Sequence, residues 1–407
     1  MFGASPETHE LVFTSGATRA LQLVGELFPW SPGGLFLHAR ESHTSALGLR
    51  QLARRGGAQC GWVGLDQLRE LSEGLAAATL LPEEGRPEAE AVGKLSDDSL
   101  PRGPNLLAFP GESNFDGARA ELACVAALRS GPLRWRVLLD AAKLACLPGA
   151  LDLSRCPADF VAVSFYKIFG CPTGLGALIA RREAAALLGR PGAPATGRPV
   201  CGEGPGAGLA ASAESGAPHW QGIAALPRQL ALARAVAPDA DRCRHVLAVC
   251  RRAYVRTRAL RHRAGGLLCT IFGRHEDPQW PDVQGPAIAL ALSWSDGAPV
   301  PYGLVQERAR ARGIVLRTGC HCNAGSCQAH LGLTDADLRH FYSSGKVCGD
   351  DLGIIDGRHT GVVRISFGLY SLEEDVDRWV AFLREEFLDR SAAPAPRGAP
   401  APPPHAP

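Results

Sequence analysis

Short apolar runs alternate with helix-like amphipathic stretches along roughly the first 180 residues of the chain. Most of these runs carry branched apolar residues at consecutive positions, so both sides of each expected strand are apolar. This pattern is typical of strands in a sheet that helices cover on both faces. The runs interpreted as strands are Leu11–Thr14, Leu35–His38, Asn105–Phe109, Val137–Asp140, Asp159–Ser164 and Leu175–Ala180. The pattern therefore predicts an α/β domain with a mainly parallel sheet.

The second half of the chain mixes helical and strand-like patterns. A helical run extends from Gln229 to about His262, and an amphipathic helix is expected over Glu373–Phe387. Between them lie three apolar segments, at Gly266–Phe272, Ala287–Ser293 and Val362–Phe367. We interpret residues 1–230 as a large α/β domain and residues 231–390 as a smaller α+β domain.

Two stretches have no periodic pattern. Arg190–Gly208 is rich in Gly and Pro and predicts a loop or hinge. Residues 391–407 are almost only Ala and Pro, which cannot bury a core and predict a disordered tail. No segment reaches the roughly 18 uninterrupted apolar residues of a membrane-spanning helix, and no signal peptide is recognisable after Met1. We expect a soluble, cytoplasmic protein.

Composition and charge narrow the chemistry. With 46% apolar residues, 21% charged residues and a net charge of +2, the chain has ordinary globular composition and gives no reason to expect nucleic acid or membrane partners. Among its 43 basic residues, the lysines are Lys94, Lys143, Lys167 and Lys346. Most of the 13 cysteines are spread singly along the chain, which is typical of a reducing compartment.

Polar residues directly after the apolar runs are candidates for a ligand site, because parallel strands end at one edge of an open sheet. The turn at Thr14–Thr18 could bind a phosphate through its amides and the Thr18 hydroxyl, or simply cap a helix. Asp140 could pair with a protonated pyridine nitrogen, or cap a helix. His43 could stack on a cofactor ring, or be an ordinary loop histidine.

Lys167 lies between an apolar strand and the Gly-rich turn that ends at Gly176. We expect this lysine to be desolvated, which favours the neutral amine that reacts with an aldehyde cofactor. The alternative is an exposed loop lysine. Because the chain has so few lysines, we favour chemistry at Lys167.

A second cluster follows in the stretch Arg317–Cys327. One interpretation is a loop that presents a nucleophilic thiolate, with Arg317 and His321 favouring the anion electrostatically. Redox-inert cysteines are one alternative, and a zinc site is another, although the spacing lacks the usual two residues between paired cysteines. The zinc ligands would be Cys320, Cys322, Cys327 and His330. Arg364 interrupts an apolar strand and could bind a substrate carboxylate, or form an internal ion pair.

Taken in this order, these motifs resemble class V aminotransferase-fold enzymes, specifically the cysteine desulfurases. The similarity extends from about Glu10 to Phe387 and is closest to the N-terminal domain of eukaryotic molybdenum cofactor sulfurases. The segments that carry it are Ser164–Gly176, Arg317–Gly332, Val347–Asp350 and Gly361–Gly368. The resemblance implies a pyridoxal phosphate enzyme that acts as a homodimer on L-cysteine, forms a protein persulfide and supplies sulfur to desulfo-molybdenum cofactor.

The resemblance also implies a role for each candidate residue. In the cofactor site, Lys167 would form the Schiff base and Asp140 would pair with the ring nitrogen. His43 would stack on the ring, and Asn114 would lie near the phenolic oxygen. Thr18 and Ser164 would contact the phosphate. Arg364, with Arg317, would bind the substrate carboxylate. Cys322 would form the persulfide, and Cys320 is the less favoured choice.

Several features depart from the family pattern. Met1 stands just before the first strand, so we expect the family's preceding segment to be missing, together with the C-terminal domain that binds molybdenum cofactor. Ala217 replaces a threonine that meets the neighbouring subunit's cofactor phosphate, and Tyr166 replaces a histidine of the bacterial enzymes. A second hypothesis is therefore a truncated, weakly active or inactive homologue that acts as a binding or regulatory subunit.

Overall fold

The chain separates into two compact units in the computed structural model. Unit 1 comprises Met1–Asn114 with Arg119–Cys243, and unit 2 comprises Phe115–Ala118 with Arg244–Pro407. The structure describes residues 2–74, 77–81, 91–94, 103–170, 173–188, 208–214 and 217–392. Nearly all of the predicted loop at 190–208 and of the predicted tail at 391–407 lies outside the described residues.

The division between the units falls later than the predicted boundary after residue 230. Helix α9 (Trp220–Val236) stays with unit 1, because Ile223 and Leu226 pack against its core. The helical run predicted from Gln229 to His262 is interrupted at Ala237 and Pro238, and α10 (Asp239–Arg258) follows. Proline disfavours the helical conformation of the residue before it, and Ala237 is accordingly extended, with φ of −165° and ψ of 157°.

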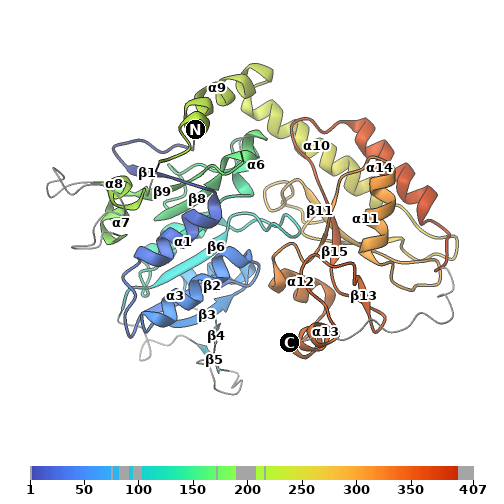
Figure 1. The fold of residues 1–407 in the computed structure, drawn as a ribbon, viewed down its shortest axis with the longest axis horizontal. Coiled ribbons are helices and arrows are strands. Elements are labelled where there is room, and N and C mark those ends of the chain that lie inside the picture. The colour runs from blue at the N-terminus through green and yellow to red at the C-terminus, as the bar shows by residue number, and fades with distance from the viewer. Residues whose placement is uncertain are drawn as a thin grey trace. The chain divides into compact units, whose positions relative to one another are not determined.

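Unit 1 is built on one sheet with nine strands among the described residues (Figure 1). Their order is β1 (His9–Thr14), β9 (Gly176–Arg181), β8 (Phe160–Ser164), β7 (Arg136–Asp140), β6 (Leu106–Pro110), β2 (Leu35–Ala39), β3 (Gln59–Val63), β4 (Ala77–Leu80) and β5 (Ala91–Lys94). Only β9 and β4 run against the others. The predicted mainly parallel α/β fold is confirmed. The strands β3, β4 and β5 were not predicted, because Gly, Ala or polar residues interrupt their apolar runs.

Alternate residues of the central strands enter two separate apolar cores. In β2, Leu35 and Leu37 belong to one core and Phe36 to the other, and β6, β7 and β8 alternate in the same way. Helices α1 (Ala17–Leu27) and α3 (Leu49–Arg55) cover the face that carries Phe36 (Figure 1). Because successive strand residues point to opposite faces, a sheet covered on both faces requires continuous apolar runs.

The remaining helices of unit 1 are short. They are α2 (Thr44–Leu47), α4 (Leu68–Ser72), α5 (Val125–Ser130), α6 (Phe165–Phe169), α7 (Arg182–Ala185) and α8 (Leu209–Ala213). Several connect a strand end to the next element, so they fix the positions of the residues at the sheet edge.

Unit 2 has the mixed α and β pattern expected from the sequence. Its antiparallel sheet has the order β10 (Cys269–Phe272), β11 (Ala287–Leu292), β15 (Val362–Ser366) and β12 (Arg317–Gly319), and β13 (Ile354–Ile355) pairs with β14 (Arg358–His359). The helices that follow α10 are α11 (Tyr302–Ala311), α12 (Ala324–Leu331), α13 (Asp335–Ser343) and α14 (Glu373–Glu386). Trp379 and Leu383 of α14 pack with Leu290 of β11 in the core of this unit.

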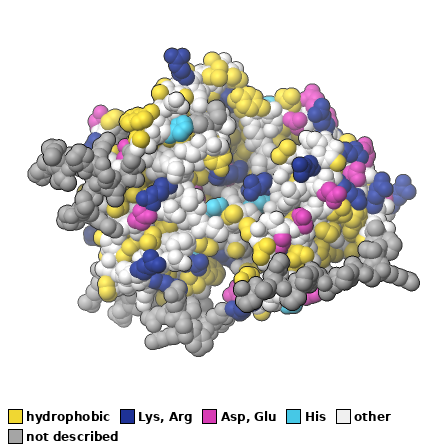
Figure 2. Space-filling model, in the orientation of Figure 1, with side chains coloured by type: hydrophobic (Ala, Val, Ile, Leu, Met, Phe, Trp, Pro, Cys, Tyr) yellow, Lys and Arg dark blue, Asp and Glu magenta, His cyan; other side chains and the backbone are white. Residues whose placement is uncertain are grey.

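Charged side chains of both signs are interspersed on the face drawn in Figure 2, and the described residues form no large patch of one sign in that view. Among the residues that the structure describes, no helix combines the length and apolar character that crossing a membrane requires.

Asp159 is a fully buried charge of unit 1 that lies just before β8. Its carboxylate is fully buried, accepts a hydrogen bond of 2.9 Å from Val137 N, and binds Arg129 Nε at 3.1 Å and Arg136 Nη1 at 3.2 Å. We predict that Asp159→Ala lowers the free energy of unfolding in urea by about 3–5 kcal/mol, because two arginines and an amide lose their shared acceptor.

Glu183 provides the matched control for Asp159. It lies 3.7 Å from Arg129 but its side chain is 73% exposed. Glu183→Ala should therefore change the unfolding free energy by no more than about 0.5 kcal/mol. Equal effects of the two substitutions would show that the buried network does not stabilise the sheet.

Candidate active site

A cavity of about 350 Å³ lies in unit 1 at the edge where the parallel strands end. The residues predicted to bind the cofactor all line it, namely Thr18, His43, Asn114, Asp140, Ser164 and Lys167. They come from segments that follow or end β1, β2, β6, β7 and β8, which are far apart in sequence. The strand-end rule thus brings these residues to one place, as the sequence predicted.

One end of the cavity suits a phosphate. Helix α1 begins after Gly16, whose φ of 142° favours glycine, and no described side chain caps its first turn. The Thr18 hydroxyl lies 2.8 Å from the Ser45 hydroxyl. A Cβ at Gly176 would lie only 2.6 Å from Gly16 Cα, so the close approach of β9 to this turn requires glycine. Uncapped helix N–H groups beside two hydroxyls form a site for an anion.

The middle of the cavity suits a pyridine ring. Ser45 N donates a hydrogen bond of 3.1 Å to His43 Nδ1, so the ring proton of the neutral imidazole lies on Nε2. Burial lowers the pKa of His43; the Asp140 charge opposes this shift, and the Lys167 charge adds to it. A neutral imidazole can stack on an aromatic cofactor without a charge penalty, and the Asp140 carboxylate can face a ring N–H.

Lys167 lies in α6, which ends at Gly170 with a left-handed φ of 83°. The side chain of Lys167 is exposed, so the expectation of a desolvated lysine is wrong for this chain. The reason is that α6 is only five residues long and the described residues leave its outer side open. The Lys167 amine makes no hydrogen bond or ion pair with any described residue, and it is therefore available for chemistry.

The candidate acceptor cysteine lies in unit 2, in the turn between β12 and α12. His321 and Cys322 both have left-handed backbones, with φ of 55° and 56°, and Asn323 then caps α12 by accepting a hydrogen bond of 3.0 Å from Ser326 N. Two such residues in succession cost about 1–3 kcal/mol each. This conformation leaves Cys322 exposed, whereas His321 is buried.

The two flanking cysteines are joined in a disulfide, which the sequence did not predict. Cys320 and Cys327 have Cα atoms 5.4 Å apart, so the bond closes the turn that carries Cys322. Among the described residues, no group of three or more His, Cys, Asp or Glu side chains is placed to bind a metal ion. Two of the four zinc ligands named from the sequence, Cys320 and Cys327, are here bonded to each other.

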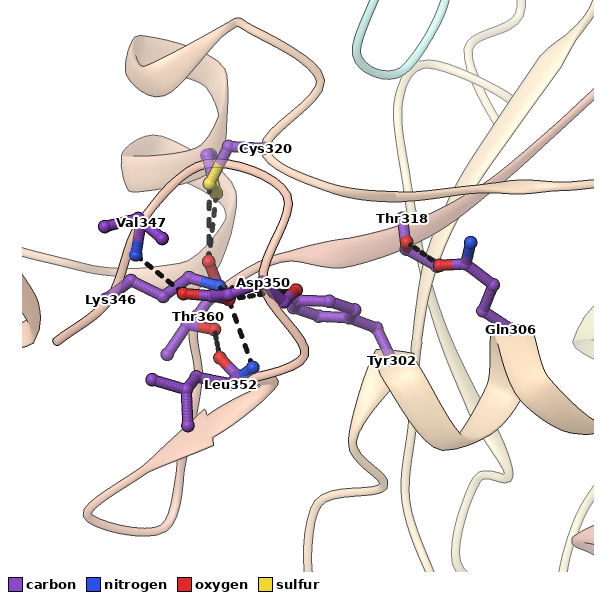
Figure 3. Close-up of polar contacts among 10 residues, drawn as sticks. Tyr302, Gln306, Thr318, Cys320, Lys346, Val347, Asp350, Leu352 and Thr360 are labelled. Carbon is purple, nitrogen blue, oxygen red and sulfur yellow. Dashed lines mark hydrogen bonds and ion pairs between the residues drawn. A yellow bond between two sulfur atoms is a disulfide. The ribbon is translucent and has the colours of Figure 1, made fainter. Parts of the chain in front are cut away.

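A polar network supports this disulfide (Figure 3). The carbonyl oxygen of Thr360 lies 3.3 Å from Cys320 Sγ, and the Thr360 hydroxyl donates to the carbonyl oxygen of Leu352. Asp350 accepts hydrogen bonds from Val347 N at 2.6 Å and from Leu352 N at 3.1 Å, and pairs with Lys346. The sequence assigned no role to the motif Val347–Asp350. In the structure this motif forms a turn that positions Leu352, which binds Thr360, and the Thr360 carbonyl oxygen in turn contacts Cys320 of the disulfide.

Two arginines lie side by side in unit 2. Arg317 of β12 is in register with Arg364 of β15. Burial and the neighbouring Arg317 charge lower the pKa of Arg364 to about 10. Burial and both arginine charges lower the pKa of His321 to about 3, so His321 is neutral and cannot supply the positive charge expected of it. A substrate carboxylate would relieve the repulsion between the two guanidinium groups.

This combination of fold and cavity is that of a pyridoxal phosphate-dependent enzyme of the aminotransferase class. The sequence profile described as Aminotransferase class-V matches residues 1–244, and the chain belongs to this family.

Three curated relatives are molybdenum cofactor sulfurases. The chain is 35% identical to that of Arabidopsis thaliana over 417 residues, which cover 95% of this chain and 49% of the relative. It is 35% identical to that of Bos taurus over 425 residues, covering 98% and 46%, and 34% identical to that of Homo sapiens over 411 residues, covering 96% and 44%. The chain spans about half the length of these relatives.

Two solved structures illustrate the shared fold. The cysteine desulfurase CsdA from Escherichia coli aligns with a TM-score of 0.62 and 19% identity, over 92% of this chain and 78% of that chain. The cystine C-S lyase C-DES, in complex with its reaction product cysteine persulfide, aligns with a TM-score of 0.66 and 17% identity, over 95% and 84%. At these identities the likeness concerns the fold alone.

Sequence reasoning missed three further charged residues that line the cavity, Arg19, Glu112 and Lys143. Lys143 was visible as one of few lysines, and it follows Asp140 closely. The signal that could have singled out Glu112 was its position just after the apolar run that forms β6.

The environment of His43 leads to a titration experiment on the protein without cofactor. Because the Asp140 charge raises the pKa of His43 against the effect of burial, Asp140→Asn should lower this pKa further. Conversely, Lys167→Ala should raise it. Both shifts can be measured by NMR from the pH dependence of the His43 ring protons.

His38 is an internal reference in the same spectra. Its pKa is lowered to about 4, mainly by burial, and neither Asp140 nor Lys167 contributes to that shift. The His38 resonances should titrate identically in all three proteins. A His43 pKa that stays constant while Asp140 is neutralised would contradict the arrangement of the cavity.

Proposed function

We propose that this chain is a cysteine desulfurase-type sulfurtransferase that takes sulfur from L-cysteine onto Cys322, with pyridoxal phosphate held in the unit 1 cavity. The observation that carries the proposal is the convergence of the six predicted cofactor residues on one cavity. Family membership and the similarity to molybdenum cofactor sulfurases support the same chemistry.

The residues fit the cofactor in charge and shape. The first turn of α1 and Thr18 would bind the phosphate, Asp140 would bind the ring nitrogen, and His43 would cover one ring face. Lys167 would hold the aldehyde carbon until the substrate amine displaces it. When bound, pyridoxal phosphate withdraws electrons from the α-carbon of an amino acid.

The remaining residues act on the substrate. The Arg317–Arg364 pair would bind the L-cysteine carboxylate. The Cys322 thiolate attacks the substrate sulfur, so that an S–S bond forms as the C–S bond breaks, and alanine leaves. Because Cys322 is exposed at the tip of a turn, the resulting persulfide is accessible to an acceptor.

Three finer proposals concern the surroundings of the enzyme. From the molybdenum cofactor sulfurases to which the chain is similar, we propose desulfo-molybdenum cofactor as the sulfur acceptor. From the same resemblance we propose a homodimer, and from the scattered cysteines a cytoplasmic location.

The visible spectrum of the protein with pyridoxal phosphate tests the foundation of this proposal. We expect a visible absorption band from the lysine-bound cofactor, and we expect Lys167→Ala to abolish it. If the wild-type protein develops no band, or if the band survives Lys167→Ala, the chain is better described as a binding or regulatory homologue.

Turnover of L-cysteine tests the acceptor thiol. Cys322→Ala should keep the visible band but lose at least about a hundredfold in alanine formation, because no thiolate is left to take the sulfur. Cys348→Ala, which changes another exposed cysteine of unit 2, is the matched control and should retain full activity. Unchanged turnover in Cys322→Ala would assign the persulfide to another residue.

A further inference from the structure

Two of the chain's lysines line the same cavity, and the structure holds them differently. Lys143 Nζ lies 3.0 Å from Glu112 Oε1, and the Lys143 side chain is only 16% exposed. This contact is an ion pair rather than a well-aligned hydrogen bond. Lys167, in contrast, is exposed and makes no ion pair or hydrogen bond with a described residue.

Glu112 is itself fixed from its other side. Its carboxylate is fully buried, and Arg119 Nε donates a hydrogen bond of 3.1 Å to Glu112 Oε2. The backbones of these two residues also form an antiparallel bridge. A buried carboxylate with a cation on each oxygen cannot turn away from Lys143 without leaving a charge unpaired.

The sheet places Glu112 and Lys143 at the edge where the parallel strands end and where the cavity lies. Glu112 follows β6 and Lys143 follows β7, and these strands are parallel neighbours. Beyond Lys143 the chain packs closely against the segment that carries Glu112, since a Cβ at Gly111 would lie 2.7 Å from Leu144 Cδ2. The residue next to Lys143 is therefore packed against the segment that carries Glu112.

A cavity that accepts an aldehyde must discriminate between two primary amines. An aldehyde reacts with a neutral amine to form an imine and water, and this step needs the nitrogen lone pair. A lysine bound as an ammonium to a carboxylate has no lone pair to offer, because its nitrogen carries three protons. The amine without such a partner is the one that reacts.

We propose that Glu112, supported by Arg119, holds Lys143 as a non-reacting ammonium, so that Lys167 is the only amine of the cavity that bonds to an aldehyde. Glu112 and Arg119 are thus positioning residues, and Lys143 is a permanent positive charge in the cavity wall. This inference rests on the proposed function for the identity of the aldehyde, but the difference between the two amines does not depend on it.

The test maps the modified lysines after the protein is incubated with pyridoxal phosphate and reduced with borohydride, which delivers hydride to the imine carbon and makes the bond permanent. Peptide mass spectrometry then reads each lysine. Wild-type protein should be labelled at Lys167 and not at Lys143. In Glu112→Gln, labelling of Lys143 should rise about tenfold, which corresponds to about 1.4 kcal/mol.

Variants of Lys167 sharpen the result. Lys167→Ala alone should leave Lys143 unlabelled, whereas the double variant Lys167→Ala, Glu112→Gln should label it. Arg119→Gln removes the cation that fixes Glu112 from its other side but keeps the Glu112–Lys143 pair, so labelling of Lys143 should rise less than in Glu112→Gln. The matched control is Glu183→Gln, which neutralises an exposed carboxylate outside the cavity lining and should leave the labelling of Lys143 at the wild-type level.

A second reagent separates failure of this inference from failure of the proposed function. Formaldehyde with cyanoborohydride methylates neutral amines without any cofactor site. Lys143 should react slowly in the wild-type protein and about tenfold faster in Glu112→Gln, as estimated above. Lys346, which pairs with Asp350 in unit 2 (Figure 3), is an internal reference whose rate should not change.

The outcomes have distinct meanings. Absence of pyridoxal phosphate labelling, with the expected methylation rates, overturns the proposed function and leaves the role of Glu112 intact. Labelling of Lys143 in Lys167→Ala with Glu112 present, or an unchanged methylation rate of Lys143 in a folded Glu112→Gln protein, overturns the inference. Circular dichroism of each variant establishes that it is folded.

Discussion

The site of unit 1 depends on a sheet whose two faces are both buried. Full burial of a large apolar side chain contributes about 1.5–3 kcal/mol, and the central strands bury such side chains on alternate faces along their whole length. Polar and charged groups are therefore confined to the strand ends, and the parallel direction of β8, β7, β6 and β2 gathers them at one edge. The chemistry of the cavity is a consequence of that confinement.

The burial of both sheet faces also explains how much of the structure of unit 1 could be predicted from the sequence. Apolar runs located six strands, and the rule that ligands gather at strand ends singled out His43, Asp140 and Lys167 before the strand order was known. The strand β3, with a polar first residue and a central glycine, lacks the continuous apolar run by which those six strands were recognised. The Glu112–Lys143 pair could not be predicted from the sequence, because it forms only when β6 and β7 are neighbours in the sheet.

Unit 2 shows a different limit of sequence reasoning. The motif around Cys322 was recognisable, but the conformation that exposes it was not, because left-handed backbones at His321 and Cys322 are imposed by their surroundings. The Cys320–Cys327 bond and the neutral state of His321 likewise depend on burial and on arginines brought in by β12 and β15. The exposure of Lys167 was missed because burial depends on what covers α6.

The close contact between Gly176 and Gly16 fixes the distance between β9 and the start of α1, the helix at one end of the cavity. Two backbones meet there with no side chain between them, so β9 and the start of α1 are in direct contact. A methyl group at position 176 would act as a wedge, tilting the helix that offers its N–H groups while touching no ligand itself. A substitution at Gly176 could therefore weaken ligand binding by displacing the start of α1, although Gly176 contributes no functional group to the cavity. A search for catalytic side chains would not find such a position.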